Sequence, residues 1–91
     1  MNVTSLPSSH GIEPKSLVGT KWIGWSSFVG DKMAVEFTDE AHCIYTSMRT
    51  KYPITYTVEG NKIFFEMVKD PFELRGRMLF SRDIPAFKKM D

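Results

Sequence analysis

The chain has 91 residues, a length that allows a single domain with a thin core. Hydrophobic residues make up 42% of the chain and aromatic residues 13%, which is typical of a folded domain that builds its core from large rings. The formal net charge of +1 argues against a strong binder of nucleic acid or of anionic membranes, and no apolar run is long enough to span a bilayer as a helix.

Residues 1–15 are rich in Ser, Pro and Gly and show no periodicity, so they are predicted to form a flexible leader. At its end, Glu13 to Val18 can form one short helical turn with Pro14 at the first position, where a helix needs no N–H donor. The sequence therefore predicts one domain over residues 16–91.

From residue 17 onward, short apolar runs alternate with turn residues. The first run covers residues 17–26 and ends near Gly30-Asp31. Residues 32–38 then alternate between apolar and polar side chains, which is the period of a strand with one buried face. Asp39-Glu40 is predicted to form a tight turn, and residues 41–48 a third strand.

Residues 49–51 are polar and are predicted to form a loop. The cleanest alternation follows in residues 52–59, where Pro53 favours a strand start or an edge because it cannot donate a ladder hydrogen bond. Gly60-Asn61 is a strong hairpin signal, since both residues tolerate positive φ. Residues 62–68 are expected to return as the partner strand.

Asp70-Pro71 interrupts the pattern, and two more short strands are expected on either side of Gly76. Asp83-Ile84-Pro85 is predicted as a further break, after which Phe87 begins a last short segment. Turns thus recur at roughly the 8–12-residue spacing that is typical of an up-and-down sandwich or barrel.

These elements predict an all-β fold, an antiparallel up-and-down meander of about seven or eight short strands that closes into a small barrel. The side chains expected to face inward and form the core are Met33, Val35, Phe37, Ile54, Tyr56, Ile63, Phe65 and Met67. Phe64 and Ile44 are apolar but fall on the outward face, so either the sheet is covered on both faces there or these residues, together with Trp25, form an interface such as a contact in a homo-oligomer.

No group of residues suggests catalysis or a cofactor. His10 lies in the predicted leader, and His42 and Cys43 are adjacent on a strand, so their side chains point to opposite faces and cannot form a nucleophile pair. Cys43 is expected to be a small buried hydrophobe. The Cys, His and acidic residues show no spacing that indicates a metal site, and the sequence predicts neither an enzyme nor a cofactor.

The C-terminal residues 75–91 are locally basic, with five Arg and Lys residues against two Asp residues. Lysine and arginine are common on exposed sheet edges, where they prevent strands of different molecules from pairing. We therefore interpret this segment as a solvated sheet edge.

Residues 17–25, Leu-Val-Gly-Thr-Lys-Trp-Ile-Gly-Trp, contain Gly-x-x-Trp after a short turn. This stretch resembles the opening of lipocalin-like (calycin) barrels, in which a Gly-x-Trp strand follows a helical turn, and the order of the later strands is similar to that of small lipocalin-like proteins of bacteria. The resemblance implies a barrel with Trp22 plugging one end, a binding role, and a periplasmic or cell-envelope location. The first residues, taken as the native N-terminus, favour the cytoplasm instead.

The first functional hypothesis is therefore a non-enzymatic barrel that binds an unknown ligand, either a small apolar molecule or another protein. The side chains expected to contact that ligand are Trp22, Phe37, Tyr45, Tyr56 and Phe65. The second hypothesis is a protein-interaction or self-assembly module without a pocket. The third is a single-stranded nucleic-acid binder resembling an oligonucleotide-binding barrel, which the basic C-terminal residues favour and the net charge disfavours.

Overall fold

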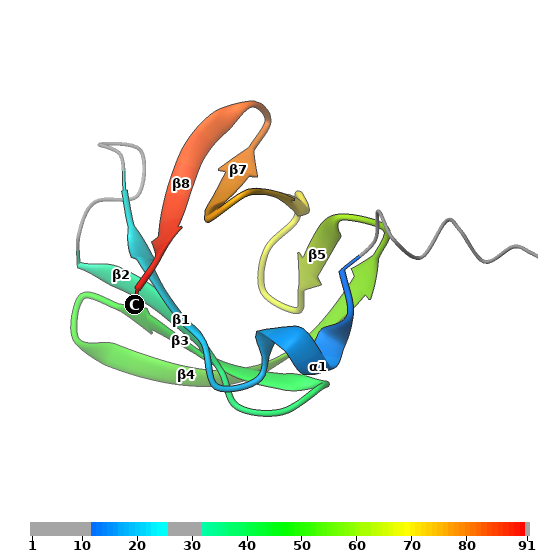
Figure 1. Cartoon of the computed structure of the whole chain (residues 1–91). Helices are drawn as coiled ribbons and strands as arrows, with labels where there is room; N and C mark the ends of the chain where they lie inside the picture. Colours follow the sequence, from blue (N-terminus) through cyan, green and yellow to red (C-terminus); the bar gives the residue numbers. More distant parts are fainter. Residues whose placement is uncertain (1–11, 26–31, 91) are drawn as a thin grey trace, which may run out of the picture.

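The computed structural model of the protein describes residues 12–25 and 32–90. In this part of the chain eight antiparallel strands follow one another around a closed barrel, and β8 pairs with β1 to close it (Figure 1). The predicted all-β meander is thereby confirmed. The elements are α1 (Pro14–Leu17), β1 (Lys21–Gly24), β2 (Met33–Phe37), β3 (His42–Ser47), β4 (Thr50–Glu59), β5 (Lys62–Phe65), β6 (Phe72–Arg75), β7 (Met78–Ser81) and β8 (Ile84–Lys89).

Because neighbouring strands are antiparallel, the strand ends fall alternately at two ends of the barrel. We call the end at which β2, β4, β6 and β8 finish the helix end, because α1 lies there. The N–H groups that flank α1 connect it to this end: Gly19 donates to the carbonyl of Phe37 at 2.8 Å, and Ile12 donates to the carbonyl of Gly60 at 2.7 Å. We call the opposite end, where β1, β3, β5 and β7 finish, the far end.

The barrel interior is filled by the protein's own side chains. A series of ring contacts crosses it from β4 to β8: Tyr56 to Phe37 at 4.9 Å between centroids, Phe37 to Phe65 at 6.0 Å, Phe65 to Phe72 at 5.6 Å, and Phe72 to Phe87 at 5.5 Å. Three of these pairs meet edge to face, a geometry that adds about 0.5–1.5 kcal/mol per pair beyond the burial of area. A barrel of this size and strand length thus has its centre occupied by its own rings.

The predicted short helical turn is also confirmed. α1 begins at Pro14, and its last residue, Leu17, is only 3% exposed and belongs to the hydrophobic core. A helix of four residues is not stable alone, so its formation depends on this packing. α1 therefore covers the helix end of the barrel and adds Leu17 to a core that a short chain cannot easily complete.

Two predicted breaks are shorter than expected. β4 begins at Thr50, so the predicted loop at residues 49–51 is a two-residue turn in which Met48 and Arg49 have φ of 53° and 76°. β8 begins at Ile84, and the β7–β8 turn likewise places two non-glycine residues, Arg82 and Asp83, at positive φ. Hairpin turns of this kind normally use Gly or Asn, so the sequence lacked the usual signal.

One predicted core residue is exposed. β5 ends at Phe65 rather than at Val68, and Met67, which was expected to face inward, is 55% exposed. The strand stops because the chain turns there, as the N–H of Val68 donates to the carbonyl of Phe65. The Glu66 carboxylate also accepts hydrogen bonds from the backbone N–H and the hydroxyl of Thr55. The alternation of the strand therefore no longer applies at residue 67.

The position of Leu17 gives a test of the fold. Leu17→Ala removes a buried side chain from the cap at the helix end and is expected to lower the free energy of unfolding by about 2–4 kcal/mol. Val18→Ala is the control, because Val18 is the next residue and is 39% exposed; its effect is expected to stay within about 0.5 kcal/mol. Urea unfolding followed by circular dichroism measures both, and equal effects would contradict the role of α1 as a cap.

Candidate functional site

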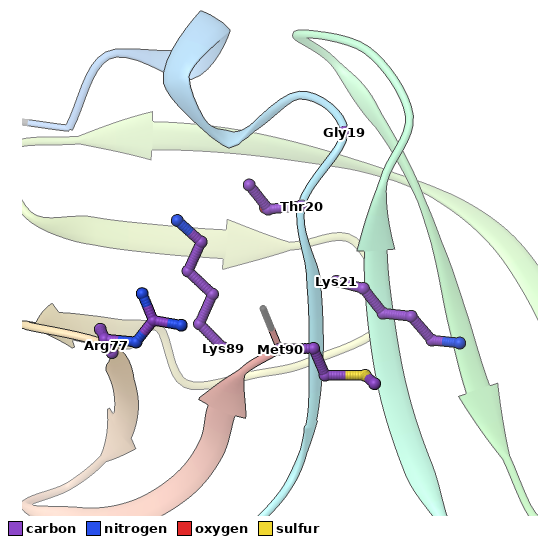
Figure 2. A pocket seen from close by; sticks show the side chains of 6 residues that line it. All are labelled: Gly19, Thr20, Lys21, Arg77, Lys89 and Met90. Carbon is purple, nitrogen blue, oxygen red and sulfur yellow. The ribbon is translucent and has the colours of Figure 1, made fainter.

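A pocket of about 370 Å³ opens at the helix end of the barrel, beside the junction of β1 and β8 (Figure 2). Its lining consists of Gly19, Thr20, Lys21, Arg77, Lys89 and Met90. Three of these residues are basic and none is acidic. A wall of one charge sign distinguishes this pocket from the groove on the outer surface near Asp70, where acidic and basic side chains alternate.

Closure of the barrel brings the basic residues together. Lys89 on β8 is paired with Trp22 on β1, and because directly opposite residues share a face of the sheet, Lys89 follows the inward direction of Trp22. The N–H of Lys89 donates to the carbonyl of Arg77 at 2.9 Å, which fixes β8 beside the β6–β7 turn. The N–H of Met90 donates to the carbonyl of Lys21 at 2.8 Å.

The basic side chains do not contribute equally. Figure 2 shows the ammonium of Lys89 and the guanidinium of Arg77 on the same side of β1, whereas the side chain of Lys21 extends to the other side. Lys89 is half-buried as a residue, so part of its side chain is covered by the protein. Lys89 and Arg77 are thus the two groups placed to contact a molecule in the pocket.

Thr20 shapes the pocket and does not supply a donor to it. Its hydroxyl donates to the carbonyl of Leu17 at 2.6 Å and accepts from the indole N–H of Trp22 at 3.0 Å. The hydrogen of the hydroxyl is therefore already used. These two bonds link the end of α1 to β1 and hold the chain at Gly19, which turns with φ of 86°.

The chemistry of this arrangement is recognition of an anion. A guanidinium carries five N–H donors in a planar fork, so Arg77 can keep a contact within the protein and still donate to a bound group. An ammonium adds a compact charge with three donors. Hydrogen bonds from such cations to a carboxylate or phosphate are shorter and stronger than bonds between neutral groups.

The interpretation of the basic C-terminal residues as a sheet edge is wrong. β8 pairs with β7 on one side and with β1 on the other, so this strand has no free edge. Lys21 was not singled out in the sequence, and Arg77 and Lys89 were noted only as part of a basic segment. A closed barrel requires the first and last strands to pair, and this requirement could have predicted that Lys21 lies near Arg77 and Lys89.

The residues predicted to bind an apolar ligand lie mostly in the packed core. Four of them are almost fully buried, with exposed fractions from 0% to 5%: Trp22, Phe37, Tyr56 and Phe65. The hydroxyl of Tyr56 donates to the carbonyl of Asp39 at 2.7 Å, and the rings of Phe37, Tyr56 and Phe65 contact one another. Tyr45 is half-buried toward the far end, where its ring lies 6.3 Å from that of Tyr52.

The residues predicted to form an interface are not brought together. Trp25 follows β1 at the far end and is 53% exposed. Ile44 lies on β3 and Phe64 on β5, and both are half-buried on the outer surface. β4 separates these two strands, so the three side chains belong to different parts of the barrel.

Cys43 is buried and His42 is exposed, as their adjacent positions on β3 require. Desolvation, with a smaller contribution from the negative charge of Glu66, raises the pKa of the Cys43 thiol to about 12. His42 instead contacts the carboxylate of Asp39 at 2.9 Å. The pKa of Asp39 is lowered by hydrogen bonds from the backbone of Ala41 and from His42. His10 and most of the predicted leader lie outside the described residues, as does the predicted turn at Gly30-Asp31.

Within residues 12–25 and 32–90, no three His, Cys, Asp or Glu side chains are grouped in a way that could hold a metal ion. None of the helices in the same residues has the length and apolar character needed to cross a bilayer. Comparison of the chain with protein-family models, with curated proteins and with solved structures found no match.

The burial of Cys43 predicts that its thiol reacts slowly with thiol reagents in the folded protein. At pH 8 the folded protein is expected to react with Ellman's reagent at least a hundredfold more slowly than the protein in urea, since the thiolate is the reactive form and its fraction falls tenfold for each unit by which the pKa rises. The same raised pKa means that the unfolded thiol ionises first, so stability is lost as pH rises above about 8.5 toward 12. Rapid labelling of the native protein would contradict the assigned burial.

Proposed function

We propose that the protein is a small non-enzymatic binding module that holds an anionic group of its ligand in the basic pocket at the helix end. The observation that carries this proposal is that Arg77, from the β6–β7 turn, and Lys89, from β8, line one pocket whose wall contains no acidic side chain. Two cations that share a pocket repel each other, and an anion between them interacts favourably with both.

The wall of the pocket also indicates what kind of anion fits. Met90 and the aliphatic stems of the lysines supply apolar surface beside the charges. A carboxylate or phosphate group carried on an organic molecule can therefore place its charge against Lys89 and Arg77 and its carbon atoms against this surface. A volume of about 370 Å³ accommodates a small organic anion.

The packed interior favours this end pocket over an apolar cavity in the barrel. The rings that were expected to line such a cavity contact one another and have almost no exposed surface. Membership of a lipocalin-like family stays a prediction, and the closed eight-stranded meander establishes the fold class alone. The proposed pocket uses the outer end of the barrel, whichever family the chain belongs to.

Replacing Lys89 tests the proposal. Lys89→Met keeps most of the aliphatic stem and removes the charge, so it is expected to weaken binding of inorganic phosphate by about fivefold or more, the equivalent of roughly 1 kcal/mol for a charged hydrogen bond. Titration with phosphate at constant ionic strength, followed by amide chemical shifts of Thr20, Lys21, Arg77 and Lys89, measures the dissociation constant.

The matched control is Lys88→Met. Lys88 is the preceding residue on β8, and its side chain lies on the outer face, 5.0 Å from the ring of Trp25. The substitution removes the same charge from the protein as Lys89→Met does. This variant is expected to bind phosphate as the wild type does. Equal weakening by both substitutions would reduce the effect to net charge, and shifts that never saturate would mean that the pocket does not bind anions.

A further inference from the structure

The far end of the barrel carries an apolar rim, which we define as Trp25, Met48, Met67 and Ile84. These side chains are 53%, 67%, 55% and 43% exposed, respectively. Each follows a different odd-numbered strand: Trp25 comes directly after β1, Met48 after β3, Met67 shortly after β5, and Ile84 after the turn that follows β7. The antiparallel order therefore places all four at the end opposite to α1 and the basic pocket.

Contacts of the backbone and side chains connect several of the chain segments at this end. The N–H of Trp25 donates to the carbonyl of Ala86 at 2.7 Å, which joins the end of β1 to the first residues of β8. Arg82, in the β7–β8 turn, contacts Asp70 of the β5–β6 connection at 3.7 Å. On the other side, β2 pairs with β3 up to Ser47, the residue before Met48. These contacts join the chain segments that carry Trp25 and Ile84 and the connections that carry Ile84 and Met67, and the ring of Trp25 lies 5.0 Å from the Lys88 ammonium on the outer wall.

Basic side chains surround the rim. The exposed cations at this end are Lys32, Arg49, Lys51, Lys69 and Arg82. Three described carboxylates lie near this end: Asp83 pairs with Arg75 and Asp70 with Arg82, whereas Glu66 accepts hydrogen bonds from the uncharged Thr55 and keeps its negative charge. Among the described residues no carboxylate forms an ion pair with Lys32, Arg49, Lys51 or Lys69, so basic side chains outnumber acidic ones around the apolar side chains in the described part of the far end.

The charge of this end decides among possible partners. In a symmetric dimer the same patch meets its copy, so the cations of one rim would face the cations of the other, which is costly. An anionic partner has no such penalty. Apolar side chains on separate connections at one end of a barrel can all enter the same flat interface, and Trp in particular favours the boundary between lipid and water.

We infer that the far end docks the protein on an anionic lipid surface, with the apolar rim in the interface and the surrounding lysines and arginines against the head groups. Apolar insertion supplies part of the binding and attraction to anionic lipid the rest. The net charge of +1 does not oppose this, because a surface responds to the charges that face it and several acidic residues, including Glu36 and Glu59, lie elsewhere on the barrel.

The experiment uses the full chain with vesicles of phosphatidylcholine alone or mixed with phosphatidylglycerol. We expect co-sedimentation with the mixed vesicles and at least tenfold weaker binding to the neutral ones, since each basic residue at an anionic surface contributes about fivefold. Binding should be accompanied by a blue shift of tryptophan emission. Trp22 is only 2% exposed, so this shift reports Trp25.

Two double variants locate the contact. Met48→Ser with Ile84→Ser removes half of the apolar rim and is expected to weaken binding to the mixed vesicles at least tenfold. The matched control is Val18→Ser with Met90→Ser, which changes two side chains of similar exposure, 39% and 43%, at the helix end. This control should bind vesicles as the wild type does, and Lys89→Met should do so as well because the basic pocket faces away from the bilayer.

Several results would overturn the inference. These are equal binding to both kinds of vesicle, no binding to either, and no loss of binding in the rim variant. Loss of vesicle binding in Lys89→Met would assign the lipid contact to the basic pocket instead. Sedimentation of the wild type and the rim variant without lipid tests whether a second copy of the chain is the partner instead. If the protein does not bind vesicles and forms a dimer that the rim substitutions dissociate, a second copy covers this end.

Discussion

The pairing of β1 with β8 is the constraint on which the rest of the structure depends. It joins residues 22–24 to residues 87–89, leaves no free edge in the β1–β8 region, and sets Trp22 opposite Lys89. Because Trp22 points into the core, its partner Lys89 is carried over the helix end, where it meets Arg77. A single register choice thus determines both the closure of the core and the position of the positive charge. A shift by one residue would reverse both faces at once.

The filled interior is the second determinant of function. With short strands, the barrel has room for its own rings, and α1 contributes Leu17 to cover the helix end. The groups that we propose for binding therefore lie at the two ends of the barrel and not at its centre. This differs from a barrel that encloses its ligand, because the ligand of an end pocket stays in contact with water and recognition depends more on charge than on buried apolar area.

Local patterns predict the fold well and the candidate site poorly, for a physical reason. Alternation identified β2 and β4, and Gly60-Asn61 identified the β4–β5 hairpin, since these signals lie within a few residues of one another. The predicted breaks at residues 49–51 and 83–85 are tight turns at Met48-Arg49 and Arg82-Asp83, and their length was overestimated because non-glycine residues adopt positive φ there, which tertiary packing must impose. The basic pocket joins residues about 70 positions apart in the chain, and the proximity of Lys88 to Trp25 depends on the same closure.

The two ends of the barrel have different chemistry, although both are basic. At the helix end, cations share a pocket of about 370 Å³, whereas at the far end cations surround exposed apolar side chains. Ile84 and Lys89 stand at opposite ends of β8, roughly 17 Å apart along the strand, although the ring of Trp25 lies on the outer wall within 5.0 Å of the Lys88 ammonium. The distance along the strand exceeds the Debye length of about 8 Å at physiological ionic strength, so each end interacts with an anion largely independently of the other. A protein docked through the far end would therefore present the basic pocket to water with its affinity for a ligand unchanged.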